Sequence, residues 1–388
     1  MKKVTCLIPC LNEEKTIHGC VSEAMRFLEL YEIDGEVLVA DNGSTDNSIE
    51  LAKAAGARVT HVSAKGYGSA LLGGIDAANS EYILMADADQ TYEWKDVNRF
   101  VELLDENYDL VMGNRFTGVI EKNAMPFLNK YLGNPVLSLI GKILFKTKVG
   151  DFHCGIRAFR KSKMQEINLT SSGMEFASEI VIKSTLANLK ITEIPTRLRV
   201  PPYDRKPHLR PIRDGWRHLR LMLSYAPKYA IALPSFLSLL LGLSIFSVVY
   251  FLSGEIFQIQ LKEHSLLISS ALIFIGFQGI FSWLLAEYSL FNNNIKRSME
   301  NFFSKLEKSK TLEIFLFSGV LIFFLGLLLN FNAFNYWQSL NYGDLENFEL
   351  LSRIGPGFIL MILGLQFTFS SFLLETIKTS NLQRKKNF

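Results

Sequence analysis

The stretch Tyr82-Ile83-Leu84-Met85-Ala86-Asp87-Ala88-Asp89 decides how the first half of the chain is interpreted. The mostly apolar run Tyr82–Ala86 predicts a short buried strand, and two carboxylates follow it directly. An Asp-x-Asp pair alone is weak evidence, because exposed turns often contain one. After a buried strand, however, Asp87 and Asp89 can share a divalent cation, since Mg²⁺ and Mn²⁺ prefer oxygen ligands and often link them to phosphates.

Strand-like and helix-like segments alternate on both sides of this stretch. The predicted strands are Val4–Pro9, Glu36–Ala40, Arg58–Val62, Tyr82–Ala86, Leu110–Gly113 and Ile156–Arg160. The predicted helices between the first five are Lys15–Leu30, Thr45–Ala55, Ser69–Ala78 and Asp96–Asn107. This alternation is typical of βαβ units, so we expect an α/β domain with a mostly parallel sheet.

Polar residues follow four of the predicted strands, where parallel sheets bind their ligands. These residues are Asn12, Glu13, Asp41, Asn42, Ser44, Asp46, Asp87, Asp89, Asn114 and Arg115. Asp41 suits recognition of N–H groups on a nucleobase, while Ser44 or Thr45 can cap the next helix. The segment Lys65–Ser69 precedes a helix, so its backbone either approaches a phosphate or packs closely against other backbone.

Four motifs in this order resemble a family 2 glycosyltransferase of the GT-A fold. They are Ile8–Glu14, Asp41–Asp46, Asp87–Asp89 and Gly113–Arg115, and the resemblance covers about residues 1–225. The branch that the sequence resembles is that of the polyprenyl-phosphate hexose synthases, which includes dolichol-phosphate mannose synthase. The resemblance implies inverting transfer of glucose or mannose from a UDP- or GDP-sugar to a polyprenyl (dolichyl or undecaprenyl) phosphate, with Mg²⁺ or Mn²⁺ as cofactor.

The resemblance also implies roles for single residues at the donor site. Asp41 reads the nucleobase, and Asp87 and Asp89 hold the metal on the donor diphosphate, with Gln90 as a further candidate ligand. The family often has a glutamine two places after the second Asp, a place that Thr91 takes here. The candidate nucleotide-sugar-binding residues are Pro9, Asn12, Glu13, Asp41, Lys65, Asp87, Arg205, Lys206 and Arg210.

The acceptor phosphate is implied to contact Arg115, and the family often has Arg-x-x-x-Ser downstream for the same phosphate. This chain has Lys130 and Asn134 at that spacing, although lysine lacks the planar fork of arginine. The candidate catalytic residues are thus Asp89, Arg115 and Lys130. Two further residues are implied to shape the sugar pocket: Asp151 at the start of a glycine-containing loop, and Glu179, for which a solvated helix face is the alternative.

Four apolar runs follow, each about 20 residues long, which is the length that crosses a bilayer core. They are Tyr229–Leu252, Ser265–Ala286, Leu312–Phe331 and Ile354–Leu374. Lysine and arginine concentrate in the loop between the second and third runs and in the C-terminal tail. The positive-inside rule therefore places the α/β domain, this loop and the C-terminus in the cytosol, in an integral protein of the plasma or inner membrane.

Two amphipathic segments are expected at the membrane surface, Ile212–Leu223 and Phe127–Phe145, because apolar residues recur in them at helical spacing beside cations. The expected domains are residues 1–211 (GT-A glycosyltransferase), 212–228 (juxtamembrane helix), 229–376 (four transmembrane helices) and 377–388 (basic tail). The expected partners are a nucleotide-sugar donor, a polyprenyl phosphate acceptor and the membrane, and the sequence leaves a homo-oligomer open.

Composition and motifs weigh against several other functions. The net charge of +3 gives no indication of nucleic acid binding, and the four cysteines form no Cys-x-x-Cys pair that would suggest zinc. A processive polysaccharide synthase is an alternative, but Arg213–Trp216 does not fit the Gln-x-x-Arg-Trp motif of those enzymes. A non-catalytic membrane scaffold is the other alternative, against which the intact Asp87 and Asp89 argue. The hexose, the nucleotide and the polyprenol length stay open.

Overall fold

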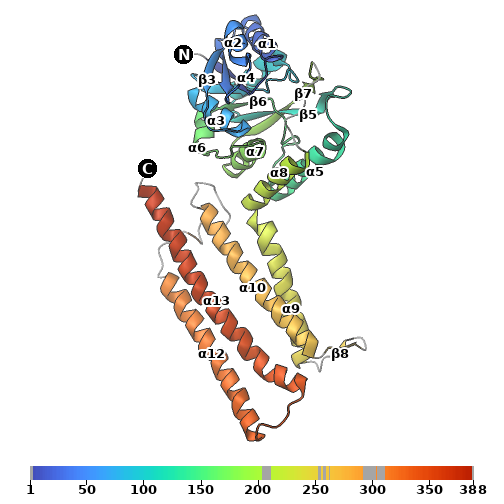
Figure 1. Cartoon of the computed structure of the whole chain (residues 1–388), viewed down its shortest axis with the longest axis vertical. Coiled ribbons are helices and arrows are strands. Elements are labelled where there is room, and N and C mark those ends of the chain that lie inside the picture. The colour runs from blue at the N-terminus through green and yellow to red at the C-terminus, as the bar shows by residue number, and fades with distance from the viewer. Residues whose placement is uncertain are drawn as a thin grey trace. The chain divides into compact units, whose positions relative to one another are not determined.

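A computed structural model of the chain describes residues 3–202, 211–251, 255–256, 259–261, 263–291, 303 and 311–386. The chain divides into two compact units, Met1–Tyr225 and Ala226–Phe388 (Figure 1). Three candidate site residues, Arg205, Lys206 and Arg210, lie outside the described residues.

The first unit is built on a seven-stranded sheet in the order β3-β2-β1-β4-β6-β5-β7. Its strands are β1 (Val4–Cys10), β2 (Gly35–Asp41), β3 (Arg58–His61), β4 (Tyr82–Met85), β5 (Leu110–Ile120), β6 (Arg157–Arg160) and β7 (Ile191–Leu198). All neighbours pair in parallel except β6, which is antiparallel to β4 and β5. The predicted mostly parallel sheet is confirmed.

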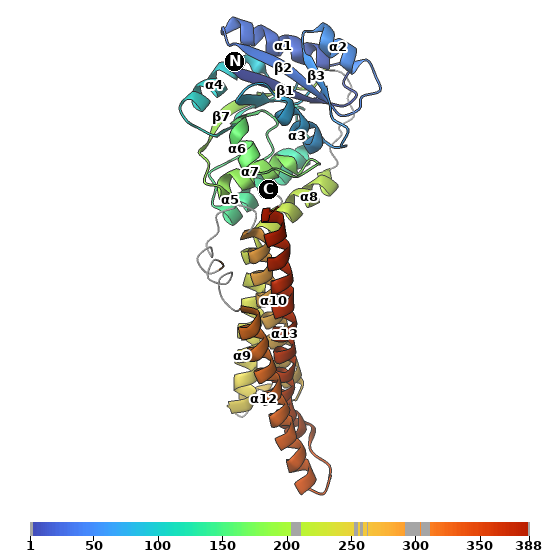
Figure 2. The same ribbon diagram turned by 90° about the vertical axis from the view of Figure 1, so that its left-hand side faces the viewer.

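Helices cover both faces of this sheet. They are α1 (Ile17–Leu30), α2 (Ser48–Ala54), α3 (Tyr67–Ala77), α4 (Val97–Asp105), α5 (Asn134–Phe145), α6 (Lys161–Glu166), α7 (Phe176–Leu186) and α8 (Pro211–Tyr225). A hydrophobic core cluster joins α1, α2 and α4 to alternate residues of β1, such as Val4, Cys6 and Ile8. The intervening Leu7 packs against Gly74 of α3 on the opposite face, as the period of two in a strand requires (Figure 2).

The second unit has four long helices that run along one another: α9 (Leu233–Phe251), α10 (Glu263–Phe291), α12 (Thr311–Ser339) and α13 (Asn347–Lys386) (Figure 2). A two-stranded ribbon, β8 (Glu255–Ile256) and β9 (Ile259–Gln260), also belongs to this unit. By length and composition, four segments can cross a membrane: Lys228–Phe251, Glu263–Leu290, Leu312–Ser339 and Phe348–Thr379. The four predicted spans are confirmed. Helices α10, α12 and α13 extend beyond the predicted apolar runs, whereas α9 lies within Tyr229–Leu252.

Glycines let these helices approach closely in pairs. A Cβ added to Gly364 of α13 would lie 2.5 Å from the backbone nitrogen of Phe323 and 2.6 Å from the oxygen of Gly319, both on α12. In the same way, a Cβ on Gly276 of α10 would lie 2.6 Å from the backbone nitrogen of Leu239 on α9. Small residues at such contacts are typical of helix pairs in membranes. The bundle thus consists of two closely packed pairs, α9–α10 and α12–α13.

Substituting Gly364 by leucine should weaken the α12–α13 pair. The added side chain has no space against the α12 backbone, so we expect a loss of about 1–3 kcal/mol in stability. The matched control is Gly355→Leu on the same helix, because a Cβ at Gly355 meets nothing within 4 Å. Thermal unfolding of the full chain in detergent measures the difference. Equal melting temperatures for the two variants would contradict this account of the helix contact.

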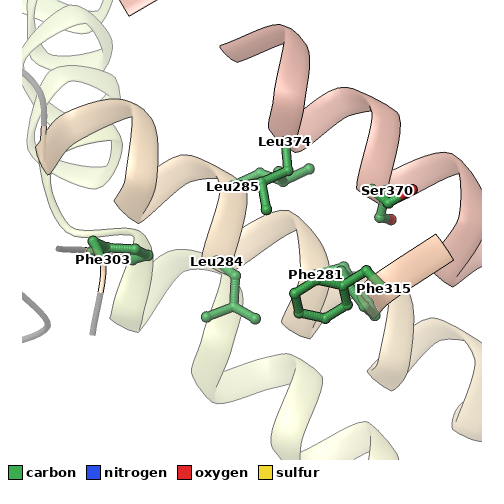
Figure 3. A pocket seen from close by; sticks show the side chains of 8 residues that line it. Phe281, Leu284, Leu285, Phe303, Phe315, Ser370 and Leu374 are labelled. Atoms are coloured by element: carbon green, nitrogen blue, oxygen red, sulfur yellow. The ribbon is translucent and has the colours of Figure 1, made fainter. Parts of the chain in front are cut away.

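A small apolar cavity lies among α10, α12 and α13 (Figure 3). It is lined by Phe281, Leu284, Leu285, Phe303, Phe315, Ser370, Ser371 and Leu374. Its volume of about 30 Å³ leaves room for one or two water molecules at most, not for a lipid chain. Beside it, the side-chain amide of Gln366 donates a hydrogen bond to Gln278, which joins α13 to α10 inside the bundle.

Candidate active site

The first unit contains a cavity of about 570 Å³, within the usual range for a small-molecule site. Its walls come from the segments that follow β1, β2 and β4, from the start of α3, from Gly173 and Met174, and from α8. The lining residues are Pro9, Cys10, Leu11, Glu13, Asn42, Lys65, Gly66, Tyr67, Ala70, Asp87, Ala88, Asp89, Gly173, Met174, Arg213, Asp214 and Arg217. Five sequence-predicted residues therefore meet here: Pro9, Glu13, Lys65, Asp87 and Asp89.

The two central carboxylates are held by neighbouring hydroxyl and amide groups. The hydroxyl of Tyr67 donates to Asp87 Oδ1 at 2.9 Å. Asp89 Oδ1 accepts from the backbone nitrogen of Thr91 at 3.1 Å and from its hydroxyl at 2.5 Å. A Cβ at Gly155 would lie 2.2 Å from Asp87 Oδ2, so this glycine leaves room for the carboxylate. The loop containing Gly155 thus contributes to the position of Asp87.

This pair of carboxylates fits a Mg²⁺ or Mn²⁺ ion, because such ions in proteins often take one or two carboxylates and complete their shell with substrate phosphates and water. Within the described part of the chain, no group of three or more His, Cys, Asp or Glu side chains is placed to hold a metal. The amide of Gln90 lies against α1, since a Cβ at Gly19 would meet its Nε2 at 1.6 Å. We therefore keep only Asp87 and Asp89 in the proposed metal set.

Arg115 forms a buried ion pair with Asp151. Its Nε and Nη2 donate to the two carboxylate oxygens at 2.7 and 2.8 Å, and its backbone nitrogen adds a third bond at 3.2 Å. Arg115 is 7% exposed and Asp151 is fully buried. Glu193 of β7 accepts from the backbone nitrogens of Gly150 and Asp151 at 2.8 and 3.0 Å. The pair therefore holds the loop that leads to Gly155, and neither residue lines the cavity.

Lys130 and Asn134 lie at the start of the α5 region, also outside the cavity lining. A short π-helix, Asn129–Gly133, precedes α5 and carries Lys130, whose Nζ is 5.5 Å from the centre of the Tyr131 ring. The amide of Asn134 donates to Met125 Sδ at 3.5 Å. The apolar residues Val136, Leu139 and Ile143 of α5 are exposed, as expected for a helix at a membrane surface.

Asp41 organises the turn after β2. Its carboxylate is buried, accepts from the backbone nitrogens of Gly43 and Ser44 at 3.1 and 3.0 Å, and lies 3.2 Å from Nδ1 of His61. Burial alone would raise the pKa of Asp41, but these hydrogen bonds, led by those from Ser44, lower it below its usual range. Asn12 Oδ1 accepts from the backbone nitrogen of Thr45 at 2.8 Å, so the turns after β1 and β2 are tied together.

The alternative of a solvated helix face for Glu179 is wrong, because this carboxylate is fully buried. It accepts from the backbone nitrogens of Thr170 and Ser171 at 3.0 and 2.7 Å, and pairs with Lys183 at 2.8 Å. The segment that it holds packs on the Lys65–Ser69 segment, where a Cβ at Gly66 would lie 2.1 Å from the carbonyl oxygen of Ser172. Gly66 therefore permits close backbone packing, and it also lines the cavity.

Sequence reasoning missed two features of the site. It did not single out Tyr67, and it assigned the arginines of α8 to a membrane surface, whereas Arg213 and Arg217 line the cavity. The only signal was the spacing of four residues, which places the two arginines on one side of a helix.

A buried hydrogen-bonded chain connects α8 to the rest of the domain. Ser178 Oγ of α7 lies 2.8 Å from His218 Nδ1 and 3.2 Å from His153 Nε2. Burial lowers the pKa of His218 to about 4, and burial followed by the neighbouring His218 charge lowers the pKa of His153 well below its ordinary value. Both imidazoles are therefore neutral at physiological pH.

Because the pKa values of these two buried histidines are lowered, we expect the protein to lose stability in acid. The unfolded chain takes up protons near pH 6.5, whereas folded His218 takes one up only near pH 4, so the unfolded state binds more protons between these values. The free energy of unfolding should then fall as pH drops through this window, by roughly 1.4 kcal/mol per pH unit for each histidine. Melting temperatures of His218→Gln should depend less on pH than those of the wild type. The exposed His18 provides the control, and His18→Gln should keep the wild-type slope.

Together, the sheet, the crossover helices and the carboxylate pair after β4 define a GT-A fold, with a C-terminal region of four membrane-type helices. Glycosyl transferase family 2 matches residues 5–167, and the C-terminal transmembrane region of family 2 glycosyltransferases matches residues 288–378. The low-salt glycan biosynthesis hexosyltransferase Agl6 of Haloferax volcanii is 30% identical over 383 residues, which cover 96% of this chain and 88% of the relative. The chain belongs to glycosyltransferase family 2 and is a membrane protein.

Two further relatives match a little less than half of the chain. The dolichyl-phosphate hexose transferase of Haloferax volcanii is 30% identical over 189 residues, covering 48% of this chain and 79% of the relative. The undecaprenyl-phosphate 4-deoxy-4-formamido-L-arabinose transferase of Yersinia pestis is 27% identical over 168 residues, covering 42% of this chain and 50% of the relative. The relatives thus include a glycan-biosynthesis hexosyltransferase and sugar transferases named for polyprenyl phosphates.

Proposed function

We propose that the protein transfers a hexose, glucose or mannose, from a UDP- or GDP-sugar to a polyprenyl phosphate, with inversion, at the cytosolic face of the membrane. The observation that carries the proposal is that Asp87 and Asp89 line one nucleotide-sized cavity in a family 2 chain with four membrane-type helices. The names of two relatives support the lipid acceptor. The bias of Lys and Arg between the spans supports the cytosolic side.

In this proposal the donor occupies the cavity. An oxygen of the acceptor phosphate attacks the anomeric carbon of the sugar in line and displaces the nucleoside diphosphate. Asp41 and Asn12 hold the turns that would enclose the nucleobase. Pro9, Glu13 and Lys65 line the same cavity as the carboxylates of Asp87 and Asp89. A Mg²⁺ or Mn²⁺ ion on Asp87 and Asp89 would stabilise the negative charge of the leaving diphosphate. Arg205, Lys206 and Arg210 are assigned to the same diphosphate from the sequence alone.

The acceptor phosphate needs no general base, because its oxygen is already anionic near neutral pH. The protein has to position and desolvate it, a task that we assign to Arg115, Lys130 and Asn134. We assign the shaping of the sugar pocket to Asp151 and Glu179. The carboxylate of Asp151 accepts from the backbone nitrogen of His153, and that of Glu179 accepts from the backbone nitrogens of Thr170 and Ser171.

The test is a transfer assay with the purified full chain in detergent. Labelled UDP-glucose and GDP-mannose are offered with dolichyl or undecaprenyl phosphate and Mg²⁺ or Mn²⁺. We expect one labelled lipid-linked monosaccharide, sensitive to chelation of the metal. A polymer as product would instead establish the processive synthase, and a folded protein without turnover on any donor would favour the scaffold.

A further inference from the structure

Helix α8 presents three different faces. Asp214, His218 and Met222 form a buried stripe that packs on α5 and α7, with 3%, 5% and 0% of their surface exposed. Ile212 and Trp216 are exposed on another side, at 86% and 59%. Arg213 and Arg217, one turn apart, line the cavity.

The rotation of α8 about its axis is fixed by specific contacts. His218 lies 2.8 Å from Ser178 Oγ, and the same oxygen is 3.2 Å from His153. The backbone nitrogen of His153 in turn donates to Asp151 Oδ1 at 3.2 Å. These bonds tie α8 to the loop beside the carboxylates, so the direction of its two arginines is built into the domain.

Charged groups of both signs line the cavity. The carboxylates come from Glu13, Asp87, Asp89 and Asp214, and the cations are Lys65 and the two α8 guanidinium groups, Arg213 and Arg217. Arg213 Nε forms an ion pair with Asp214 Oδ1 at 3.7 Å, a separation too long for a hydrogen bond. Arg115 differs, because its Nε and Nη2 are both engaged by Asp151. A guanidinium in a half-buried cavity is well suited to bind a phosphate with two parallel hydrogen bonds.

We propose that Arg213 and Arg217 bind a phosphate group of a reactant in this cavity, either the donor diphosphate or the acceptor phosphate. The proposal rests on the proposed function for the identity of the two reactants. It adds α8, which ends three residues before the first membrane-type segment at Lys228, to the reaction site itself.

The experiment compares Arg213→Gln, Arg217→Gln and the double variant in the full chain. The donor arm measures binding of UDP and GDP with Mn²⁺ by calorimetry, and the acceptor arm measures KM for dolichyl and undecaprenyl phosphate. We expect the double variant either to weaken nucleotide binding or to raise the acceptor KM by roughly 10- to 100-fold. This is the effect of losing charge-assisted hydrogen bonds. A weaker nucleotide assigns the arginines to the donor diphosphate, and a raised acceptor KM assigns them to the lipid phosphate. Values within twofold of the wild type in both arms would overturn the proposal.

Arg220 provides the matched control, because it is exposed on the same helix and outside the cavity lining. Arg220→Gln should leave both arms unchanged, and an equal effect of this variant would overturn the proposal in favour of a general role of charge on α8. Arg217→Lys, which keeps the charge but not the fork, should give an intermediate value. Nucleotide binding can be measured without turnover. A wild type that binds UDP or GDP through Arg217 but transfers no sugar would contradict the proposed function and would support this inference. Failure of the wild type in both transfer and nucleotide binding would end both.

Discussion

Asp89→Ala is expected to lower the rate of sugar transfer by roughly 10³-fold or more, because a carboxylate that supports charge stabilisation on the leaving diphosphate is lost. Both Asp87 and Asp89 line the cavity, and Asp89 is fixed by two hydrogen bonds from Thr91. The fold should survive, since the side chain faces the cavity and not the core. Initial rates with labelled donor, over a range of Mn²⁺ concentrations, measure the effect.

The control for this substitution is Asp76→Ala, which removes an exposed carboxylate of α3 in the same domain. It should keep nearly full activity. A variant Asp89→Ala that retained more than a tenth of the wild-type rate would show that the ion, if used, is held elsewhere.

The second large effect is expected on stability, from Asp151→Ala. This substitution leaves the guanidinium of Arg115 buried without its carboxylate, and breaking a buried ion pair on one side destabilises a protein by about 3–5 kcal/mol. The bidentate geometry at 2.7 and 2.8 Å and the complete burial of Asp151 place this pair in that class. Urea unfolding of the full chain in detergent measures the loss.

A double-mutant cycle separates the pair from its surroundings. Arg115→Met combined with Asp151→Leu removes both charges and keeps apolar volume, so the double variant should recover most of the stability lost in Asp151→Ala. If Arg115 also contacts the acceptor phosphate, the recovered fold should remain poor in transfer. A double variant no more stable than Asp151→Ala would show that the unpaired guanidinium of Arg115 is not the cause of the loss.

The carboxylate pair could be predicted because its signal is local. Tyr82–Ala86 is a short apolar run, and Asp87 and Asp89 follow it directly. These eight residues therefore predict a buried strand, two carboxylates at its end, and a metal-binding role for these carboxylates. Strand β7 was missed for the opposite reason. It lies at the sheet edge, its residues are only partly buried, and Pro195 within it argues against a strand interior.

Long-range pairings left no such signal. Arg115 and Asp151 are 36 positions apart, and nothing in either segment indicates that the arginine meets that carboxylate. The helical spacing of Arg213 and Arg217 was visible in the sequence. It predicts that both side chains lie on one face of a helix, but not whether that face contacts a membrane surface or a cavity. Four residues that the resemblance assigned to the donor site through continuous motifs, Pro9, Glu13, Asp87 and Asp89, all line one cavity.

The glycine contacts of the membrane-type helices also bear on how the chain is made. Each close contact joins helices that are neighbours in the sequence, α9 with α10 and α12 with α13. We therefore expect each pair to assemble soon after its second helix has left the ribosome, without help from the other pair. A hairpin adds two crossings at a time, so gaining or losing the α12–α13 hairpin during evolution would leave the catalytic domain on its original side of the membrane.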